Sequence, residues 1–394
     1  MEERDAAARR EITAYPLEFT GSGGEYFRVW IVNVLLTIVT LGLYTPLARR
    51  RTAQYFYGHT LVAGSPLEFT AQAKRMLLGF LLFVGLYAAL KIAEQTGQTN
   101  MVAVIMLGGA VLAPYFWGSA MRFRFNATRW RGVRLQFRAG WGEVYGASWP
   151  VFAFVLCWGG AGFLIEMLAG KSSGRHFGAA IAVACAAAFL SVLCAVRLEY
   201  NYKSLMVARG RIGGQAGRWK PEFGDFVRIW FATVAVFLGA MLVSGLGMAA
   251  IMGGSFAMFK GAGKPGFMQI LVFIAIGFAV LFMAFLISAP ARAYREARMF
   301  QLVWSNIGVS KVARFKSDLR PWRFVGLRTM NVFLSLLTMG FYRPFARVSE
   351  YRMKSESVTL HVKGGLDQLA GQLSREEQAV GDAIADAVGL ELVG

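Results

Sequence analysis

The sequence predicts an all-α polytopic membrane protein with small β-hairpins in the loops of one membrane face. Three observations predict this class: long apolar runs, a shortage of charged residues, and a loop pattern that recurs along the chain. Of the 394 residues, 56% are hydrophobic and only 16% are charged, whereas about 25% of residues in soluble proteins are charged. So little charge, at a mean hydropathy of +0.46, cannot cover the surface of a soluble globular protein, and that class is excluded.

Six apolar runs are predicted to cross the membrane as helices, because about 20 apolar residues span the hydrocarbon core. These runs are residues 76–90, 101–117, 149–168, 179–196, 229–252 and 268–289. The first two are short, so flanking residues must complete them. Residues 1–19 carry charges of both signs and no apolar core. We therefore expect no signal peptide there, and insertion through the internal helices.

The net charge of +19 is concentrated in alternate loops. The loops rich in Lys and Arg are residues 49–75, 122–138, 203–228 and 292–323, and the poor ones are residues 94–100, 170–177 and 253–266. By the positive-inside rule, the basic loops face the cytoplasm. Anionic head groups attract each nearby Lys or Arg by about 1 kcal/mol, so we expect the lipid bilayer, and no nucleic acid, as the partner. The sequence predicts neither a protein partner nor an oligomeric state.

The recurring loop pattern is a proline near a helix end, then Thr, Gly and Phe at 14, 18 and 23 residues after it. Its two complete copies are Pro46, Thr60, Gly64 and Phe69, and Pro114, Thr128, Gly132 and Phe137. A third copy begins at Pro290 and reaches Trp304 and Gly308 in register, with the aromatic Phe315 two places late. Such a repeat indicates one supersecondary unit used several times. Each unit reads as a helix end, a basic stretch, a β-hairpin around the glycine and the start of the next helix.

The starts of helices also recur. Residues 24–30 (GEYFRVW) match residues 224–230 (GDFVRIW) position by position, and residues 142–145 (GEVY) form a weaker copy. An acidic residue in the first turn interacts favourably with the helix dipole, and a tryptophan suits the head-group region. We interpret this motif as the start of a helix at the membrane surface. The alternative is a binding role for its glycine and its acid.

Two further apolar elements, residues 29–47 and 325–345, flank the six predicted spans. They share the most specific local signal in the chain, since residues 33–49 (NVLLTIVTLGLYTPLAR) align with residues 331–347 (NVFLSLLTMGFYRPFAR). Together with Tyr55-Phe56 and the first loop hairpin, this motif resembles the YjgN family of bacterial inner-membrane proteins, which contain a domain of unknown function. Residues 381–387 (GDAIADA) also resemble the tail of that family.

The resemblance covers essentially the whole chain. It is loose at residues 197–217, where the expected proline is missing and an additional glycine-rich stretch is present. The resemblance implies a multi-pass location in the bacterial inner (cytoplasmic) membrane. It implies no activity, and it supplies no catalytic residues.

The two flanking elements can be placed in two ways. If both span the membrane, the protein has eight crossings and both termini lie on the periplasmic side. If both dip into the membrane and return, both termini are cytoplasmic and all repeat copies lie on one side; Gly42 and Pro46 favour such a break.

Re-entrant segments would be candidates for a permeation path, because broken backbone at membrane depth needs protein or a wet cavity around it. The polar residues that would line this path are Asn33, Thr37, Thr40, Asn331, Ser335 and Thr338. Alternatively, these hydroxyl and amide groups bond to their own helix or to a neighbouring one.

No catalytic, cofactor-binding or metal-binding motif is present. The three histidines, His59, His176 and His361, are scattered and have no second ligand at suitable spacing. All three cysteines lie inside apolar runs, where each is expected to act as a small buried hydrophobic residue. We therefore expect a protein that is not an enzyme and that binds no cofactor or metal.

Two functions remain open. The first is membrane transport or permeation of a small or amphipathic solute, which internal repeats support because many transporters contain repeated units. The second is a non-catalytic scaffold or envelope-maintenance protein that binds anionic lipid or a partner through its basic cytoplasmic face. The arginines expected to contact head groups are Arg49, Arg122, Arg298, Arg347 and Arg352.

We expect three regions along the chain. They are an N-terminal segment (residues 1–28), a repeat-built membrane domain (29–346), and a C-terminal region (347–394) with a hairpin and an acidic amphipathic tail. The pair Ser374 and Glu377 would cap the helix of that tail.

Overall fold

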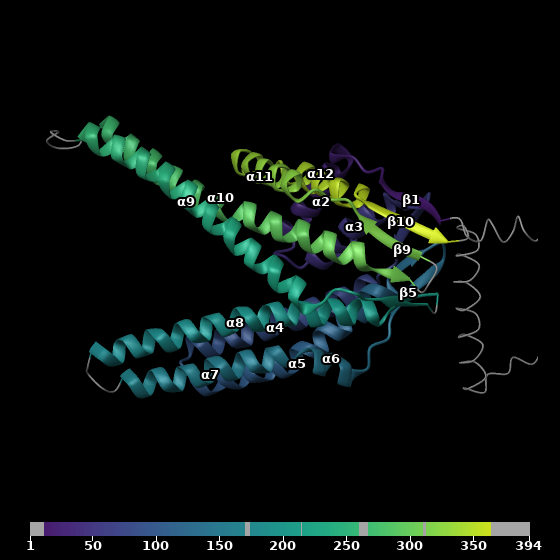
Figure 1. Cartoon of the computed structure of the whole chain (residues 1–394), viewed down its shortest axis with the longest axis horizontal. Helices are drawn as coiled ribbons and strands as arrows, with labels where there is room; N and C mark the ends of the chain where they lie inside the picture. The colour runs from purple at the N-terminus through teal and green to yellow at the C-terminus, as the bar shows by residue number, and fades with distance from the viewer. Residues whose placement is uncertain (1–11, 170–173, 214, 260–266, 310–312, 364–394) are drawn as a thin grey trace, which may run out of the picture.

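A closed β-barrel lies at one end of the molecule, and helices extend from it toward the other end (Figure 1). The computed structural model describes residues 12–169, 174–213, 215–259, 267–309 and 313–363. Each of the ten strands pairs antiparallel with its neighbours in chain order, and the first strand pairs with the last. A closed barrel leaves no strand edge unpaired.

The strands are short, and two kinds of connection alternate between them. The strands are β1 (Ile12–Phe19), β2 (Thr60–Val62), β3 (Ser65–Phe69), β4 (Thr128–Trp130), β5 (Val133–Phe137), β6 (Gly210–Ile212), β7 (Gln215–Arg218), β8 (Gly308–Val309), β9 (Ala313–Ser317) and β10 (Val358–Lys363). Connections of two or three residues join β2 to β3, β4 to β5, β6 to β7 and β8 to β9. Helices make all the other connections between strands that are consecutive in the chain. The first and last strands, β1 and β10, pair without a connecting segment.

The helices form five pairs, and each pair leaves the barrel and returns to it. The pairs are α2 (Gly23–Val39) with α3 (Thr45–Gly58), α4 (Ala73–Gln95) with α5 (Thr99–Asn126), α7 (Trp149–Ala169) with α8 (Gly174–Ala208), α9 (Phe223–Phe259) with α10 (Phe267–Asn306), and α11 (Pro321–Leu337) with α12 (Arg343–Glu356). The short helix α6 (Trp141–Ala147) precedes α7. Since neighbouring strands are antiparallel, all helix pairs leave from one end of the barrel, and the short connections lie at the other.

The prediction of a mostly helical, polytopic membrane protein is confirmed by five helices long enough to span a membrane. The hairpins expected in the loops are present, but they join into one ten-stranded barrel, so the prediction of small hairpins and of an all-α class is corrected. Hairpins from loops far apart in the sequence pair with one another, as where β3 pairs with β4 and β5 with β6. An isolated two-stranded hairpin is marginally stable, and its edges leave backbone groups unpaired. Closure of the ring removes both problems, but the spacing of residues within one loop does not reveal it.

The structure contains five copies of the repeat. Two of these copies are not recognised in the sequence: the hairpin β6–β7, in the region where the pattern is loose, and the strand pair β10 and β1, which comes from opposite parts of the described chain. The register predicted for the copy that begins at Pro290 is wrong. In the complete copies, Gly64 and Gly132 occupy the turn with φ of 73° and 81°, whereas Gly308 begins strand β8.

Five of the predicted spans correspond to helices long and apolar enough to cross a membrane. These helices are Ala73–Gln95, Thr99–Asn126, Trp149–Leu168, Phe177–Ala208 and Phe223–Ala249. The sixth predicted span, residues 268–289, lies within α10, a helix of 40 residues.

The flanking elements, residues 29–47 and 325–345, do not form single helices. Each breaks at a turn, where Leu41 and Gly42 have φ of 50° and 93° and Met339 and Gly340 have φ of 50° and 97°. The chain then returns to the barrel as α3 or α12. The alternative in which each element crosses once is therefore wrong.

The chain ends belong to the same fold as the repeats. Residues 12–19 supply β1, and residues 358–363 supply β10, which pairs with β1 and β9 where we expected a separate C-terminal hairpin. The acidic tail, with Ser374 and Glu377, lies outside the described residues.

Apolar side chains fill the barrel, because alternate residues of the strands point inward. The buried residues of this core are Leu17, Val62, Trp130, Val133, Ala313, Val358, Leu360 and Val362. Phe300 and Trp304 of α10 pack against the same core. Trp130 Nε1 also donates a hydrogen bond to the carbonyl of Val62 (3.1 Å), which joins β4 to β2, the strand on the other side of β3.

Replacement of Gly217 by alanine should destabilise the protein. A Cβ atom there would lie 2.2 Å from the carbonyl oxygen of Val207 in α8. Because that atom belongs to the backbone, relief requires β7 to move away from α8. We expect Gly217→Ala to cost about 2 kcal/mol, measured as a lower thermal midpoint of the purified protein. Gly224→Ala is the control, since a Cβ atom at Gly224 has no atom within 4 Å; equal midpoints for the two variants would contradict this packing.

Candidate functional site

A cavity of about 830 Å³ lies where α8, α9, α10, α11 and α12 meet beside the barrel. Phe300 and Trp304, which also pack against the barrel core, form part of its wall. Val234 and Phe237 line it from within the apolar run of α9. The cavity therefore lies at the junction between the barrel and the membrane helices.

One side of the cavity carries a cluster of charged side chains from α8 and α10. Glu199 accepts a hydrogen bond from Arg295 Nη2 at 2.5 Å, and Lys203 Nζ lies 3.1 Å from the other carboxylate oxygen. One carboxylate is thus shared by two cations. This cluster joins the helix pair α7/α8 to the pair α9/α10.

A second cluster joins α10 to the pair α11/α12. Glu296 accepts hydrogen bonds from Arg328 and from Lys354, the latter at 2.8 Å. Arg328 also lies 3.8 Å from Glu350. Burial raises the pKa of Glu296, but the positive charges of Lys354 and Arg328 outweigh burial, so its pKa lies below the ordinary value. Glu296 is therefore ionised at neutral pH.

Two further groups at the cavity offer unused hydrogen-bond donors. The Arg295 guanidinium lies over the Trp230 ring, 4.3 Å from its centre. Arg295 Nε and Trp230 Nε1 are both buried and have no hydrogen-bond partner among the described residues. Arg292 is exposed at the cavity and forms no ion pair with any residue that the structure describes.

The site thus combines positive charge with an apolar wall. Such a combination can hold a molecule with a polar head and an apolar chain, because each part meets a surface of matching polarity. Within the described ranges, no three His, Cys, Asp or Glu residues are grouped so that they could hold a metal ion.

The residues predicted to line a permeation path lie in the two short helix pairs and do not line the cavity. Asn33 and Asn331 are buried, and their amides donate to the carbonyls of Ala48 and Ala346 at 3.4 and 3.3 Å. Each bond joins the two helices of one pair.

The three threonine hydroxyl groups predicted for the same path bond to their own helix or turn. Thr37 donates to the carbonyl of Asn33 (2.7 Å), and Thr40 and Thr338 each donate to the carbonyl four residues before. Thr40 and Thr338 also accept a hydrogen bond from the amide four residues later, at 3.0 Å in each turn. The backbone carbonyl of Ser335 accepts a hydrogen bond from the Gly340 amide at 2.7 Å, within the same turn.

Four of the five arginines predicted to contact head groups bond to the protein itself, and two of them do so in the same way. Arg122 Nη2 donates to the carbonyl of Ala139 at 2.7 Å, and Arg352 Nη2 donates to the carbonyl of Gly21 at 2.8 Å. Both carbonyls lie just before the start of the next helix, so each arginine ties a strand–helix junction to the preceding helix. Gln54, at the equivalent place in the first copy, donates to the carbonyl of Phe69 at 3.4 Å.

The other predicted arginines differ among themselves. Arg347 Nη1 donates to Tyr26 Oη at 3.2 Å, and Arg298 bonds to Tyr294 and Gln301 of its own helix. Arg49 is exposed and has no bond to any described residue. Of the five, Arg49 alone keeps its whole guanidinium available to the surroundings, within the described part of the chain.

The recurring helix starts are capped as their sequence predicts. Ser22 Oγ accepts from the Glu25 amide at 3.2 Å, and Glu25 accepts from the Ser22 amide at 3.3 Å. Glu143 likewise accepts from the Gly140 amide at 2.9 Å. The pKa values of Glu25 and Glu143 lie below the ordinary value, first because of these backbone hydrogen bonds. The prediction that the motif starts a helix is confirmed.

Sequence reasoning missed the charged cavity. Glu199 and Lys203 follow the apolar part of α8 at a spacing of four, which is a signal for an exposed helical ion pair. Their partner Arg295 lies almost a hundred residues away, and Arg328 and Lys354 come from other helix pairs. Nothing in the local pattern indicates that these groups meet.

Comparisons with known proteins give a family and relatives. The family described as "Bacterial protein of unknown function (DUF898)" matches residues 14–387. Inner membrane protein YjgN of Escherichia coli O157:H7 and of Escherichia coli strain K12 are each 28% identical to the chain over 142 residues, which is 36% of this chain and 35% of each relative. Inner membrane protein YjgN of Salmonella typhimurium strain LT2 is 26% identical over 139 residues, 35% of this chain and 34% of the relative.

The chain thus aligns with about a third of the length of these relatives. No solved structure matches it.

Replacement of Arg122 by glutamine should lower stability whether or not anionic lipid is present. The variant loses the bond to Ala139 and the contact with the Trp141 ring, whose centre lies 4.0 Å from the guanidinium. We expect a cost of about 2 kcal/mol, measured as the thermal midpoint in neutral detergent with and without phosphatidylglycerol. Arg49→Gln serves as the control. A loss that appears only with the anionic lipid would instead indicate a head-group contact.

Proposed function

We propose that this chain, which belongs to the DUF898 family of bacterial proteins of unknown function, takes an amphipathic solute from the bilayer into the cavity beside its barrel and transports it. The chain is a multi-pass protein of the inner membrane, consistent with the names of its relatives and with its apolar helices. The observation that carries the proposal is the cavity of about 830 Å³, which is charged on one side and apolar on the other.

A path along the barrel axis is disfavoured, because apolar side chains fill the barrel interior. Leu360 and Val362 are at most 3% exposed, and Trp130 is 4% exposed. Phe300 and Trp304 separate the cavity from this core. A water-filled channel through the barrel would require the whole core to move, whereas entry from the side requires no such change.

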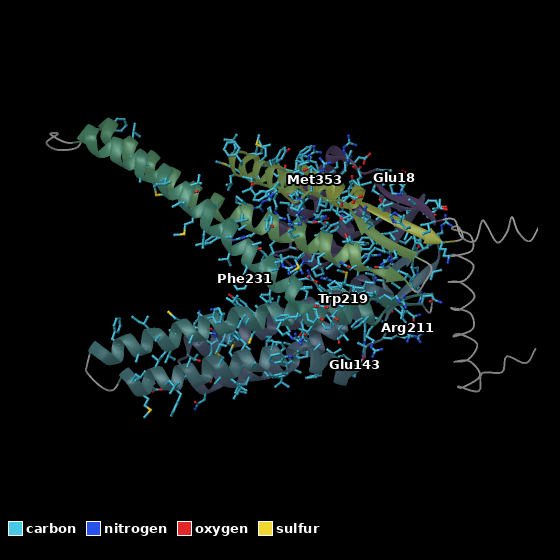
Figure 2. All side chains as sticks on the ribbon, viewed as in Figure 1. Glu18, Glu143, Arg211, Trp219, Phe231 and Met353 are labelled. Atoms are coloured by element: carbon cyan, nitrogen blue, oxygen red, sulfur yellow. The ribbon has the colours of Figure 1, made fainter. Side chains whose placement is uncertain are left out.

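Entry from the side is supported by the divergence of two helix pairs. In Figure 1, α9/α10 leaves the barrel at an angle to α7/α8, so the pairs separate with distance from the barrel. Phe231 on α9 is 68% exposed. Figure 2 shows it on the side of the molecule from which the helix pairs extend, away from the barrel residues Glu18 and Arg211. Apolar surface of this kind favours contact with lipid chains.

The proposal has the barrel in the cytoplasm, with the two short helix pairs dipping into the membrane and returning. The turns of these pairs expose Leu41 and Met339 by 94% and 93%. Fully exposed apolar side chains at a helix turn suit the hydrocarbon of a bilayer. Several strands of the barrel carry exposed basic side chains, among them Arg134 and Arg314, as the positive-inside rule expects for the cytoplasmic side.

A bulky residue at Val234 should slow transport, because Val234 lines the cavity. We expect Val234→Trp to slow the exchange of a fluorescent phospholipid between the leaflets of proteoliposomes by about tenfold, as for a loss of about 1.4 kcal/mol. The matched control is Val243→Trp on the same helix, since Val243 is 70% exposed and does not line the cavity.

Exchange no faster than in protein-free vesicles would argue against transport. Equal rates of lipid exchange in Val234→Trp and Val243→Trp would show that the solute does not pass through the cavity. In the former case the alternative function leads, a non-catalytic scaffold that binds anionic lipid or a partner through the basic outer wall of the barrel.

A further inference from the structure

We infer that the solute of the cavity carries an anionic head group, a phosphate or a carboxylate, bound by Arg292, Arg295 and Lys203. This inference rests on the proposed function, because it names the class of amphipathic molecule that the cavity takes. It differs from the head-group contacts expected from the sequence, since none of those arginines lines this cavity.

The balance of charge at the cavity favours an anion. Five cations line it, and two carboxylates, Glu199 and Glu296, face them. The side chains of these two acids are each within 3.1 Å of two cations, and Glu350 lies 3.8 Å from Arg328, so five cations meet three carboxylates and positive charge remains in excess. An anion in the cavity would lower the electrostatic cost of holding these cations together.

The unused donors point to oxygen acceptors. Trp230 Nε1 and Arg295 Nε are buried without a partner in the described chain, and a buried donor left unpaired is costly. Both groups line or adjoin the same cavity, in which the Arg295 guanidinium stacks on the Trp230 ring. A phosphate or carboxylate offers several acceptor oxygens, and a guanidinium binds such groups with two parallel hydrogen bonds. A cationic head group would be repelled by the excess positive charge of the cavity, and an uncharged one would gain nothing from that charge.

The rest of the wall distinguishes a lipid-like anion from a free one. Val234, Phe237 and Met299 present apolar surface beside the cationic groups. Free phosphate shares the head-group chemistry but gains nothing from this surface, whereas an acyl chain gains about 0.8 kcal/mol for each buried CH₂ group. The cavity is therefore expected to bind an anionic amphiphile more tightly than the anion alone.

The test compares three probes on the whole purified protein in neutral detergent, by native mass spectrometry and by thermal shift. The probes are dioleoyl phosphatidic acid, dioleoylglycerol, which has the same acyl chains and no phosphate, and inorganic phosphate. We expect the anionic lipid to bind at least about tenfold more tightly than either of the other two. Arg292→Gln should weaken binding of the anionic lipid by about tenfold and leave binding of the neutral lipid unchanged.

Two substitutions, compared with a matched control, distinguish a loss of lipid binding from a loss of the folded state. Arg292 is exposed and unpaired within the described residues, so its replacement leaves the charge clusters intact. Arg295→Gln tests the stacked guanidinium directly. The matched control is Arg314→Gln, which removes the same charge from the exposed outer wall of β9.

The outcomes separate the two levels of the proposal. Equal binding of both lipids, reduced by Val234→Trp but not by Arg292→Gln, would overturn the anionic head group and leave the amphipathic solute. Inorganic phosphate that binds as tightly as the anionic lipid would overturn the lipid-like class. Lipid binding that neither Val234→Trp nor Arg292→Gln changes would overturn both.

Discussion

The backbone pairing between β1 and β10 holds together two segments from opposite ends of the chain, in register from Ile12 with Lys363 to Pro16 with Thr359. This pairing completes a ring in which every strand has two neighbours. It also constrains the rest of the chain. Since neighbouring strands are antiparallel, each helical segment must return to the end of the barrel that it left, so each segment is a helical hairpin. Among the described residues, the three long helix pairs contain the five helices that are long and apolar enough to cross a membrane, and the two short pairs turn back at Leu41-Gly42 and Met339-Gly340.

The order of strands also determines where the short pairs lie. Because β1 and β10 are neighbours, the pairs α2/α3 and α11/α12 are neighbours too, and they pack through the rings of Phe27 and Phe345 and of Trp30 and Phe341. Beside them, α10 carries Arg295 and Glu296 at consecutive positions, each bonded to a different helix pair. The charged cavity is thus a consequence of long and short helix pairs meeting around one barrel.

Local features of the fold could be predicted from the sequence, because their causes are local. The acidic residue of each recurring helix start caps that helix, and the glycines Gly64 and Gly132 occupy turns with positive φ. The ring could not be predicted, since β1 finds its partner more than three hundred residues away. One overlooked signal was available: Pro344 precedes Val358 by the same 14 residues that separate Pro46 from Thr60.

The recurring arginines illustrate a second limit. Arg122 and Arg352 occupy equivalent positions because each must reach the carbonyl of an equivalent strand–helix junction. A repeat in sequence therefore marks a repeated structural contact as readily as a repeated binding site. The charged groups of the cavity, in contrast, come from four helices of three different helix pairs, and no recurring motif of the sequence contains them.

Barrel closure can be tested most directly by a disulfide between the first and last strands. Ala14 and His361 are register partners on β1 and β10. With the three natural cysteines replaced, Ala14→Cys/His361→Cys should crosslink rapidly in isolated membranes under mild oxidation, and the same first variant with Arg134→Cys on β5 should not. Crosslinking of both pairs alike, or of neither, would contradict a closed barrel and with it the arrangement of the helix pairs.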